Sequence, residues 1–339
     1  MLQIKNTLGG GGGFYPSVFV TGLSETDTVS MTGEGKTYTP TWTTKEDGTS
    51  GWLFEKIKEL GTYTITASNE IKTITETVVV DVATEFNIEM YFVKIVSWTN
   101  GTDEEIANMV AAADAGMINL TDYWAVGDER SVSLSAMSAT GVGESHVAQT
   151  VTMVLMNAGG KTIANATPSG RTTCSFIVGM KNGLANGTTA ETGYINSSDT
   201  ISGGWESCAR RTWCNNVFRN AIPSALRDIF KQHLNITSGG SSNTITTSTD
   251  YFALPAEKEV FGSITFANPN VESNLTQFEY YKTSANRVKK RGDSGSANGW
   301  WERSLYSGSS SYFCNVGSGG GAGYGTASTT YMLAPFGCI

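Results

Sequence analysis

The stretch from Ser296 to Ile339 constrains this chain most, because two apolar ends enclose a long segment of small polar residues and tyrosines. The front end is Trp300-Trp-Glu-Arg-Ser304, and the back end runs from Leu333 to Ile339. Between them lies a run that is almost all Gly, Ser, Thr, Tyr, Asn and Ala. A disordered tail rarely begins with paired tryptophans or ends in an apolar anchor, so we expect a surface segment held between two anchored strands. The alternative is a flexible tail, because Gly/Ser-rich composition normally cannot bury a core.

The composition of this segment is typical of antibody-like binding loops. Tyr supplies rigid amphipathic contact area, while Ser, Gly and Asn supply adaptable hydrogen bonds. We therefore expect a set of ligand contacts, called here the contact set: Tyr306, Ser309, Ser311, Tyr312, Asn315, Ser318, Tyr324, Thr326, Thr329, Thr330 and Tyr331. The apolar neighbours form an expected scaffold set beneath them: Trp300, Trp301, Arg303, Phe313, Val316 and Phe336. Glu302 next to Arg303 is interpreted as a buried structural ion pair.

Composition indicates a β-rich α+β protein of two domains. The chain has 339 residues, 39% of them hydrophobic, and its 39 glycines and 7 prolines favour many turns between short strands. The net charge of −8 argues against nucleic acid as a partner, since phosphate binding needs clustered Lys and Arg. No apolar run reaches the roughly 18 to 20 residues of a membrane span, so membrane insertion is not expected. The N-terminus lacks the apolar core of a signal peptide, which predicts synthesis in a bacterial cytoplasm.

Two segments precede the C-terminal domain. Residues 1–13 end in five glycines and are expected to be a flexible leader. Residues 14–95 alternate in period two between β-branched or aromatic residues and polar ones, as in the expected strand over 37–42, which predicts a small β-sandwich. With its strand Gly61-Thr-Tyr-Thr-Ile65, this segment resembles the small Ig-like sandwich modules of phage tail and bacterial surface proteins. Such modules usually serve as spacers or attachment points.

The C-terminal domain is expected to cover residues 100–339. It opens with a capping box, Thr102 and Glu105, before an apolar stripe of helical spacing. Further helices are predicted over 205–218 and over 223–234, where Pro223 suits a first turn. Strands are predicted over 130–135 and 150–156.

No metal or cofactor site is expected. The five cysteines are odd in number and widely spaced, which favours reduced, buried thiols over disulfides or zinc. Asn268-Pro-Asn270 is only a weak calcium motif. Glycan hydrolysis needs two opposed carboxylates. The sequence alone cannot show which two of the candidate acidic residues would lie opposite each other: Glu206, Asp228, Glu257, Glu259, Glu279 and Glu302.

Six motifs spread over the last two-thirds of the chain resemble a domain common in prophages and gut bacteria. They are Asp122 to Asp128, Gly143 to His146, Gly203 to Arg211, Phe252 to Gly262, Trp300 to Ser304, and Leu333 to Ile339. That domain in turn resembles the C-type-lectin-like fold shared by formylglycine-generating enzymes and by the variable proteins of diversity-generating retroelements. The resemblance to the variable proteins implies a hypervariable surface, here residues 305–332, on a stable scaffold. The enzymatic branch needs an active-site cysteine pair, and Cys314 has no near partner in sequence.

These features together lead us to expect a non-enzymatic receptor-binding (adhesion) protein on a phage tail or particle surface, a component of the virion. The expected partners are a host cell-surface protein or glycan and other tail or virion proteins, with a homotrimer by analogy with tail fibres. Two alternatives stay open: a structural tail or decoration protein without a receptor role, and a glycan-acting enzyme.

Overall fold

A computed structural model describes residues 15–69, 73–90, 94–138, 145–185, 193–240 and 242–339. The expected leader at 1–13 and the motif residues Gly143 and Glu144 lie outside the described residues. The chain divides into two compact units, Met1–Lys94 and Ile95–Ile339. With 36% strand and 17% helix spread over several sheets, the fold is a β-rich α+β fold, as the composition predicts. Within the described residues, no helix combines the length and apolar character needed to cross a membrane.

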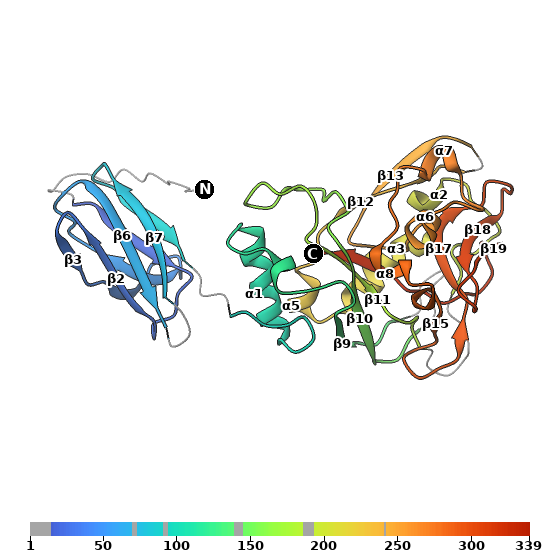
Figure 1. The fold of residues 1–339 in the computed structure, drawn as a ribbon, viewed down its shortest axis with the longest axis horizontal. Helices are drawn as coiled ribbons and strands as arrows, with labels where there is room; N and C mark the ends of the chain where they lie inside the picture. Colours follow the sequence, from blue (N-terminus) through green and yellow to red (C-terminus); the bar gives the residue numbers. More distant parts are fainter. Residues whose placement is uncertain (1–14, 70–72, 91–93, 139–144, 186–192, 241) are drawn as a thin grey trace. The chain divides into compact units, whose positions relative to one another are not determined.

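The N-terminal unit consists of two four-stranded sheets (Figure 1). The strands of the first sheet, in spatial order, are β4 (Thr41–Thr44), β5 (Ser50–Phe54), β1 (Ser17–Thr21) and β8 (Glu85–Glu89). Those of the second are β3 (Lys36–Tyr38), β2 (Thr28–Gly33), β6 (Gly61–Ser68) and β7 (Thr73–Val80). Buried residues of both sheets, such as Val18 and Phe54 from one and Met31 and Ile65 from the other, form one core.

The strand expected over residues 37–42 is wrong in one respect. The chain leaves β3 at Tyr38 and enters β4 at Thr41, and these two strands belong to different sheets. Pro40 lies in the break, where its missing N–H removes a donor that a continuous strand would need. The sequence alternation is therefore real but serves two short strands.

The C-terminal unit is built on a five-stranded sheet that includes the last strand of the chain. Its strands, in spatial order, are β14 (Phe252–Ala253), β20 (Phe336–Cys338), β11 (Phe176–Met180), β10 (Gln149–Ala158) and β9 (Glu129–Leu134). The terminal strand β20 pairs on both edges, with β11 and with β14. The carbonyl of Ile339 also accepts a bond from the Ser175 N–H at 2.6 Å. The C-terminus is thus anchored inside the unit.

A second sheet contains the Tyr/Ser/Gly-rich segment. It orders β17 (Trp300–Leu305), β18 (Tyr312–Val316) and β19 (Ala322–Thr326), all antiparallel. Two hairpins accompany it: β12 (His233–Ser238) with β13 (Ile245–Asp250), and β15 (Lys289–Lys290) with β16 (Ala297–Asn298). The segment is therefore a packed sheet and not the flexible tail of the alternative reading.

The helices agree in part with those predicted from the sequence. Helix α1 (Asp103–Asp114) has the predicted capping box of Thr102 and Glu105. The helix expected over 205–218 is interrupted once, at Cys208, whose backbone is extended. Helix α2 (Gly204–Ser207) precedes this break. After it, α3 (Ala209–Trp213), a π-helical turn (Cys214–Phe218) and α4 (Arg219–Ala221) follow one another with helical backbone throughout. The remaining short helices are η1 (Leu120–Asp122), α6 (Glu257–Phe261), α7 (Pro269–Glu272), α8 (Glu279–Lys282) and η3 (Ser284–Arg287).

The helix expected over 223–234 is wrong beyond its first turn. Helix α5 covers only Ser224–Arg227, and the chain then becomes extended and enters β12. The Lys231 N–H donates to the carbonyl of Cys338 at 2.7 Å, and the Leu234 N–H donates to that of Thr162 at 2.9 Å. These tertiary backbone bonds replace the intrahelical ones, which the local apolar pattern could not reveal.

Candidate ligand-binding surface

Three tyrosines stack on one another at the β17–β18–β19 sheet, and we call Tyr306, Tyr312 and Tyr324 the tyrosine cluster. The ring centroids lie 4.5 Å apart for Tyr306 and Tyr324, 5.5 Å for Tyr312 and Tyr324, and 6.2 Å for Tyr306 and Tyr312. The ring planes are nearly parallel, with interplanar angles of 11° to 15°. Stacked rings at such distances attract one another beyond their buried area.

The strand register explains why the rings meet. Tyr312 pairs with Thr326, and Cys314 pairs with Tyr324, so Tyr312 and Tyr324 project from the same face of neighbouring strands. Tyr306 follows β17, and its N–H donates to the carbonyl of Tyr312 at 3.0 Å. This bond returns the chain to β18 and brings the third ring over the other two.

Phe266, from a segment outside the sheet, packs against the tyrosine cluster. Its ring meets Tyr306 edge-on at 5.7 Å and 86°, and Tyr324 at 5.0 Å and 72°. The backbone N–H and the hydroxyl of Ser307 both donate to the Phe266 carbonyl, each at 2.9 Å. The segment following α6 is thus fastened to the sheet, and the tyrosines rest against a fixed ring. No sequence motif pointed to Phe266.

A buried carboxylate holds the Phe266 segment in place. Glu257 is fully buried, and its side-chain oxygens accept backbone N–H bonds from Thr265 at 3.1 Å, Phe266 at 3.0 Å and Ala267 at 2.7 Å. The Glu257 N–H in turn donates to the hydroxyl of Ser304 on β17 at 2.8 Å. Glu257 therefore links the sheet to the loop that supports the tyrosines.

The contact set divides between the two faces of the sheet. Thr326 shares the face of Tyr312 and Tyr324, and Tyr324 is the most open of the tyrosine cluster at 44% exposed. Ser318 is exposed. The following residues are partly buried: Tyr306, Ser309, Ser311, Tyr312, Thr326, Thr329, Thr330 and Tyr331.

Two members of the contact set lie on the opposite face. Asn315 pairs with Trp301 and is only 3% exposed, so the expectation of an exposed Asn315 is not met. Strand alternation is the reason, because Asn315 follows Cys314 and precedes Val316 on a strand whose other face carries the tyrosine cluster. Tyr331 packs edge-on against Trp301 at 4.8 Å and 82°, on the same side as Asn315. The six residues of the scaffold set (Trp300, Trp301, Arg303, Phe313, Val316 and Phe336) are all buried.

A second loop borders the sheet near the C-terminal end of β19. The N–H groups of Ile195 and Asn196 both donate to the carbonyl of Ala327, at 3.0 and 3.1 Å. The Asp199 carboxylate accepts from the N–H of Ser328 at 3.1 Å and from its hydroxyl. These bonds hold the pKa of Asp199 below its usual value, with the Ser328 hydroxyl as the largest cause. An ionised carboxylate therefore lies beside this surface, a feature that the sequence did not signal.

The comparisons with known proteins give a single family. Residues 181–338, just under half of the chain, match the family described as a domain of unknown function (DUF6273). No curated protein and no solved structure matches the chain. The matched segment contains the whole β17–β18–β19 sheet, the tyrosine cluster, Phe266 and Asp199.

The ion pair expected between Glu302 and Arg303 is wrong. Arg303 instead forms two bonds to Glu259, from its two terminal nitrogens at 2.5 and 2.9 Å, and Lys161 also donates to Glu259. The pairing of β17 with β18 shifts register between Trp301 and Leu305, and in this irregular stretch Arg303 pairs with Glu259. Arg303 and Lys161 together hold the pKa of Glu259 down at about 2, although burial alone would raise it.

Glu302 is fully buried. Its two carboxyl oxygens have no hydrogen-bond partner among the described residues. Burial raises the pKa of Glu302 well above its usual value, and the nearby carboxyls of Glu257 and Glu272 raise it further. Burial also raises the pKa of Glu272 to about 7, although the Ser304 hydroxyl donates to it at 2.6 Å. Glu302 is therefore held as a neutral acid.

Five of the six acidic residues considered for glycan hydrolysis are either buried or held in an ion pair. Glu257, Glu259 and Glu302 are buried. Asp228 pairs with Arg227 at 2.9 Å, and Glu279 pairs with Lys282.

Asn268 caps α7, where its side chain accepts from the Asn270 N–H. Over the residues that the structure describes, no cluster of His, Cys, Asp and Glu is arranged to hold a metal ion.

Proposed function

We propose that the C-terminal unit binds a molecule on the surface of a host cell, and that the tyrosine cluster is the centre of its contact surface. The observation that carries this proposal is the parallel stack of Tyr306, Tyr312 and Tyr324 against Phe266, with Tyr324 left 44% exposed. Tyrosines are enriched among the residues that dominate binding energy at protein interfaces. A tyrosine already fixed by stacking loses little side-chain entropy on binding.

The surroundings of the cluster suit recognition by shape and hydrogen bonding. Serine and threonine hydroxyls lie on the same segment, and Asp199 adds a negative charge at its border. The function would then be adhesion without covalent chemistry. The ligand class is a protein or a glycan, because both offer apolar surface next to hydrogen-bonding groups.

The finer proposal is a C-type-lectin-like domain of the kind found in variable proteins of diversity-generating retroelements, with residues 305–332 as the variable region. The start of β18 supports it, since Tyr312 is partly exposed while Phe313 and the rest of the strand are buried. Substitutions at accessible positions would change the surface without disturbing the scaffold.

The remaining parts fit a particle-surface adhesin. We propose that the N-terminal unit is an Ig-like spacer or attachment module that joins the binding unit to other tail or virion proteins. Many copies on one particle, or three in a trimer as in tail fibres, would offset a weak single site. The alternative is a structural decoration protein, which would bind no host receptor.

A bead-adhesion assay separates these functions. Beads that carry many copies of the full chain would be incubated with a panel of intact bacterial cells and with a glycan array. We expect Tyr324→Ala to abolish the adhesion that the unaltered chain shows. Tyr123→Ala is the matched control, because Tyr123 is 43% exposed and lies far along the chain from the cluster. Equal adhesion of both variants, or no adhesion by the unaltered chain to any cell or glycan, would favour the decoration protein.

A further inference from the structure

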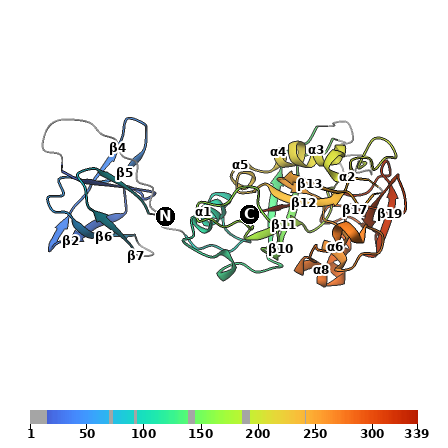
Figure 2. The ribbon, with the colours of Figure 1, turned by 90° about the horizontal axis from the view of Figure 1, so that it is seen from above.

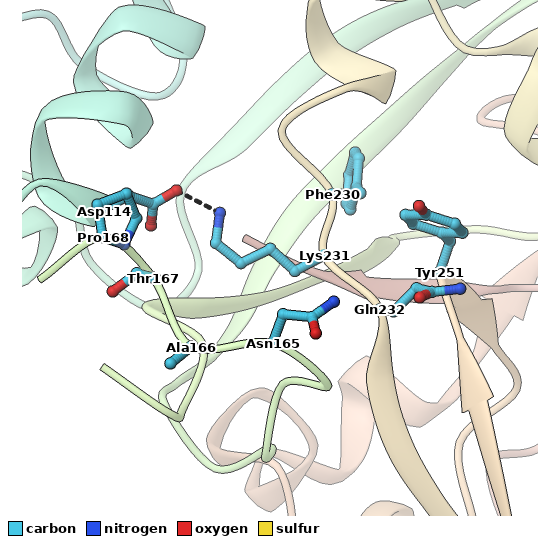
Figure 3. A pocket seen from close by; sticks show the side chains of 9 residues that line it. All are labelled: Asp114, Asn165, Ala166, Thr167, Pro168, Phe230, Lys231, Gln232 and Tyr251. Atoms are coloured by element: carbon cyan, nitrogen blue, oxygen red, sulfur yellow. Dashed lines mark hydrogen bonds and ion pairs between the residues drawn. The ribbon is translucent and has the colours of Figure 1, made fainter. Parts of the chain in front are cut away.

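A concave site lies in the C-terminal unit away from the tyrosine cluster. It is a pocket of about 280 Å³ between the end of α1, the loop 165–168, the segment 230–232 that joins α5 to β12, and Tyr251 (Figure 3). In both ribbon views α1 and β19 occupy opposite ends of this unit (Figures 1 and 2). The pocket is therefore distinct from the proposed adhesion surface.

Backbone bonds hold the loop over the pocket at both ends. The Ala164 N–H donates to the carbonyl of Gln232 at 2.8 Å, and the Ser169 N–H donates to that of Asp114 at 2.9 Å. Between them, the Thr167 N–H donates to the carbonyl of Arg171 at 2.9 Å and closes a turn. The walls are thus fixed before any ligand arrives, as they are in most small-molecule sites.

One wall carries a group of three paired charges. Asp114 accepts from Lys231 at 2.5 Å through one oxygen and from Arg171 at 2.6 Å through the other. Figure 3 shows the Lys231 side chain reaching across to Asp114. The ammonium group keeps further N–H donors for a ligand. The two cations and one carboxylate leave a net charge of +1, and both cations are already paired with Asp114.

The remaining lining is polar at the rim and apolar at the base. The side-chain amides of Asn165 and Gln232 have no hydrogen bond to another described residue, so each offers both donors and an acceptor. Pro168 and the buried ring of Phe230 present carbon surface. Tyr251 completes the wall, and the Arg219 guanidinium lies 3.9 Å from its ring centroid.

We infer that this pocket binds a single neutral saccharide unit. A pyranose presents hydroxyls that both donate and accept together with patches of C–H, and the pocket offers amides, an ammonium group and carbon surface in one cavity. The volume is just below the range of about 300–1,000 Å³ that is usual for larger ligands, which fits one ring and not a longer chain. The occupant is a free sugar or the last unit of a surface glycan.

Ligand-observed NMR tests this inference. The full chain would be mixed with the methyl glycosides of glucose, galactose, mannose and N-acetylglucosamine, and saturation transfer to each would be titrated. We expect at least one to bind with a millimolar Kd. Gln232→Ala and Asn165→Ala should each weaken it about fivefold to tenfold, the effect of one lost hydrogen bond.

Three controls make the result decisive. Asn274→Ala removes an exposed amide elsewhere and should leave the Kd unchanged, and all variants should keep the unaltered melting temperature. Tyr324→Ala should also leave the Kd unchanged, so loss of adhesion through the tyrosine cluster and loss of this site are distinguishable. An oligosaccharide that ends in the bound sugar shows whether a glycan terminus is accepted. Absence of transfer to all four glycosides, unchanged binding in both amide variants, or displacement of the sugar by inorganic phosphate would overturn the inference.

Discussion

Tyr306 and Tyr324 stack with their ring centroids 4.5 Å apart and their planes 14° from parallel, although they come from different segments of the chain. Tyr306 follows β17, and Tyr324 lies within β19, with Tyr312 of β18 against both. This contact joins all three strands of the sheet into one aromatic surface. Because the surface is assembled by packing, its shape should depend on residues outside it.

Phe266→Ala should weaken adhesion without unfolding the protein. The substitution removes the edge-on contacts to Tyr306 and Tyr324, each worth about 0.5–1.5 kcal/mol, and frees both rings to change rotamer. Adhesion by the bead assay should fall several-fold, while circular dichroism stays unchanged. Phe261→Ala, at a partly buried ring on α6, is the control. Full adhesion by the Phe266 variant would show that the tyrosines need no external support.

Glu259→Gln and Glu302→Gln should differ sharply in stability. The first leaves Arg303 and Lys161 buried beside a neutral group and should cost about 3–5 kcal/mol of unfolding free energy. The second replaces an acid that is already neutral with a group of similar shape, so the change should stay below about 1 kcal/mol. Urea denaturation of both variants measures the contrast. Similar losses would contradict the charge states assigned here.

The stability of the Glu272→Gln variant relative to the unaltered chain should increase as pH rises. The folded-state pKa of Glu272 is raised to about 7, so the native state binds more protons than the unfolded state between about pH 4.5 and 7. The contribution of Glu272 to stability is therefore complete below about pH 4.5 and is lost as pH rises towards 7. Glutamine does not titrate, so the stability of the variant relative to the unaltered chain should rise by up to about 3 kcal/mol across this window.

The stability of the variant must be compared with that of the unaltered chain at each pH. The reason is that the titration of another group changes stability with pH in the opposite direction to Glu272. Burial lowers the pKa of His233 to about 3, so its contribution to stability grows with pH over part of the same range. That contribution cancels in the difference between the two proteins. Urea denaturation at about pH 5 and about pH 8 provides the data. A difference that does not change with pH would mean that Glu272 has an ordinary pKa.

The sequence predicted much of the architecture because its strongest signals are local. The Thr102–Glu105 capping box does mark the start of α1, and the apolar ends of the last stretch do anchor a sheet. The helix predictions that were wrong have their causes in the tertiary structure. Residues 228–234 leave the helical pattern because β20 and Thr162 offer backbone partners. The interruption at Cys208 gives no local warning in the sequence.

The candidate site could be predicted only in outline. Composition indicated Tyr306, Tyr312 and Tyr324, but stacking depends on a register that composition does not carry. The same register turns Asn315 inward, and the partner of Arg303 is the distant Glu259 and not its sequence neighbour Glu302. Phe266 and Asp199 come from distant loops, so only the folded chain brings them to the sheet.

Population sequencing should show where variation concentrates. If residues 305–332 are a retroelement-diversified region, substitutions in the 3′ end of the gene should gather at codons of accessible positions such as Tyr312 and Tyr324. They should coincide with adenines in a nearby repeat that accompanies a reverse transcriptase gene. A uniform 3′ end without such a repeat would leave a fixed binding surface and remove the diversification proposal.

A substitution scan of residues 305–332 with two readouts separates the role of each residue in binding from its role in folding. Each variant would be displayed on a cell or phage, with correctly folded protein measured by protease resistance and binding measured by adhesion to the cells identified above. The account predicts that changes at Tyr306, Tyr312 and Tyr324 lower adhesion at nearly constant folding. Changes at buried residues such as Phe313 should lower both. If adhesion follows folding at every position, the tyrosine cluster is only a structural element and the binding proposal is wrong.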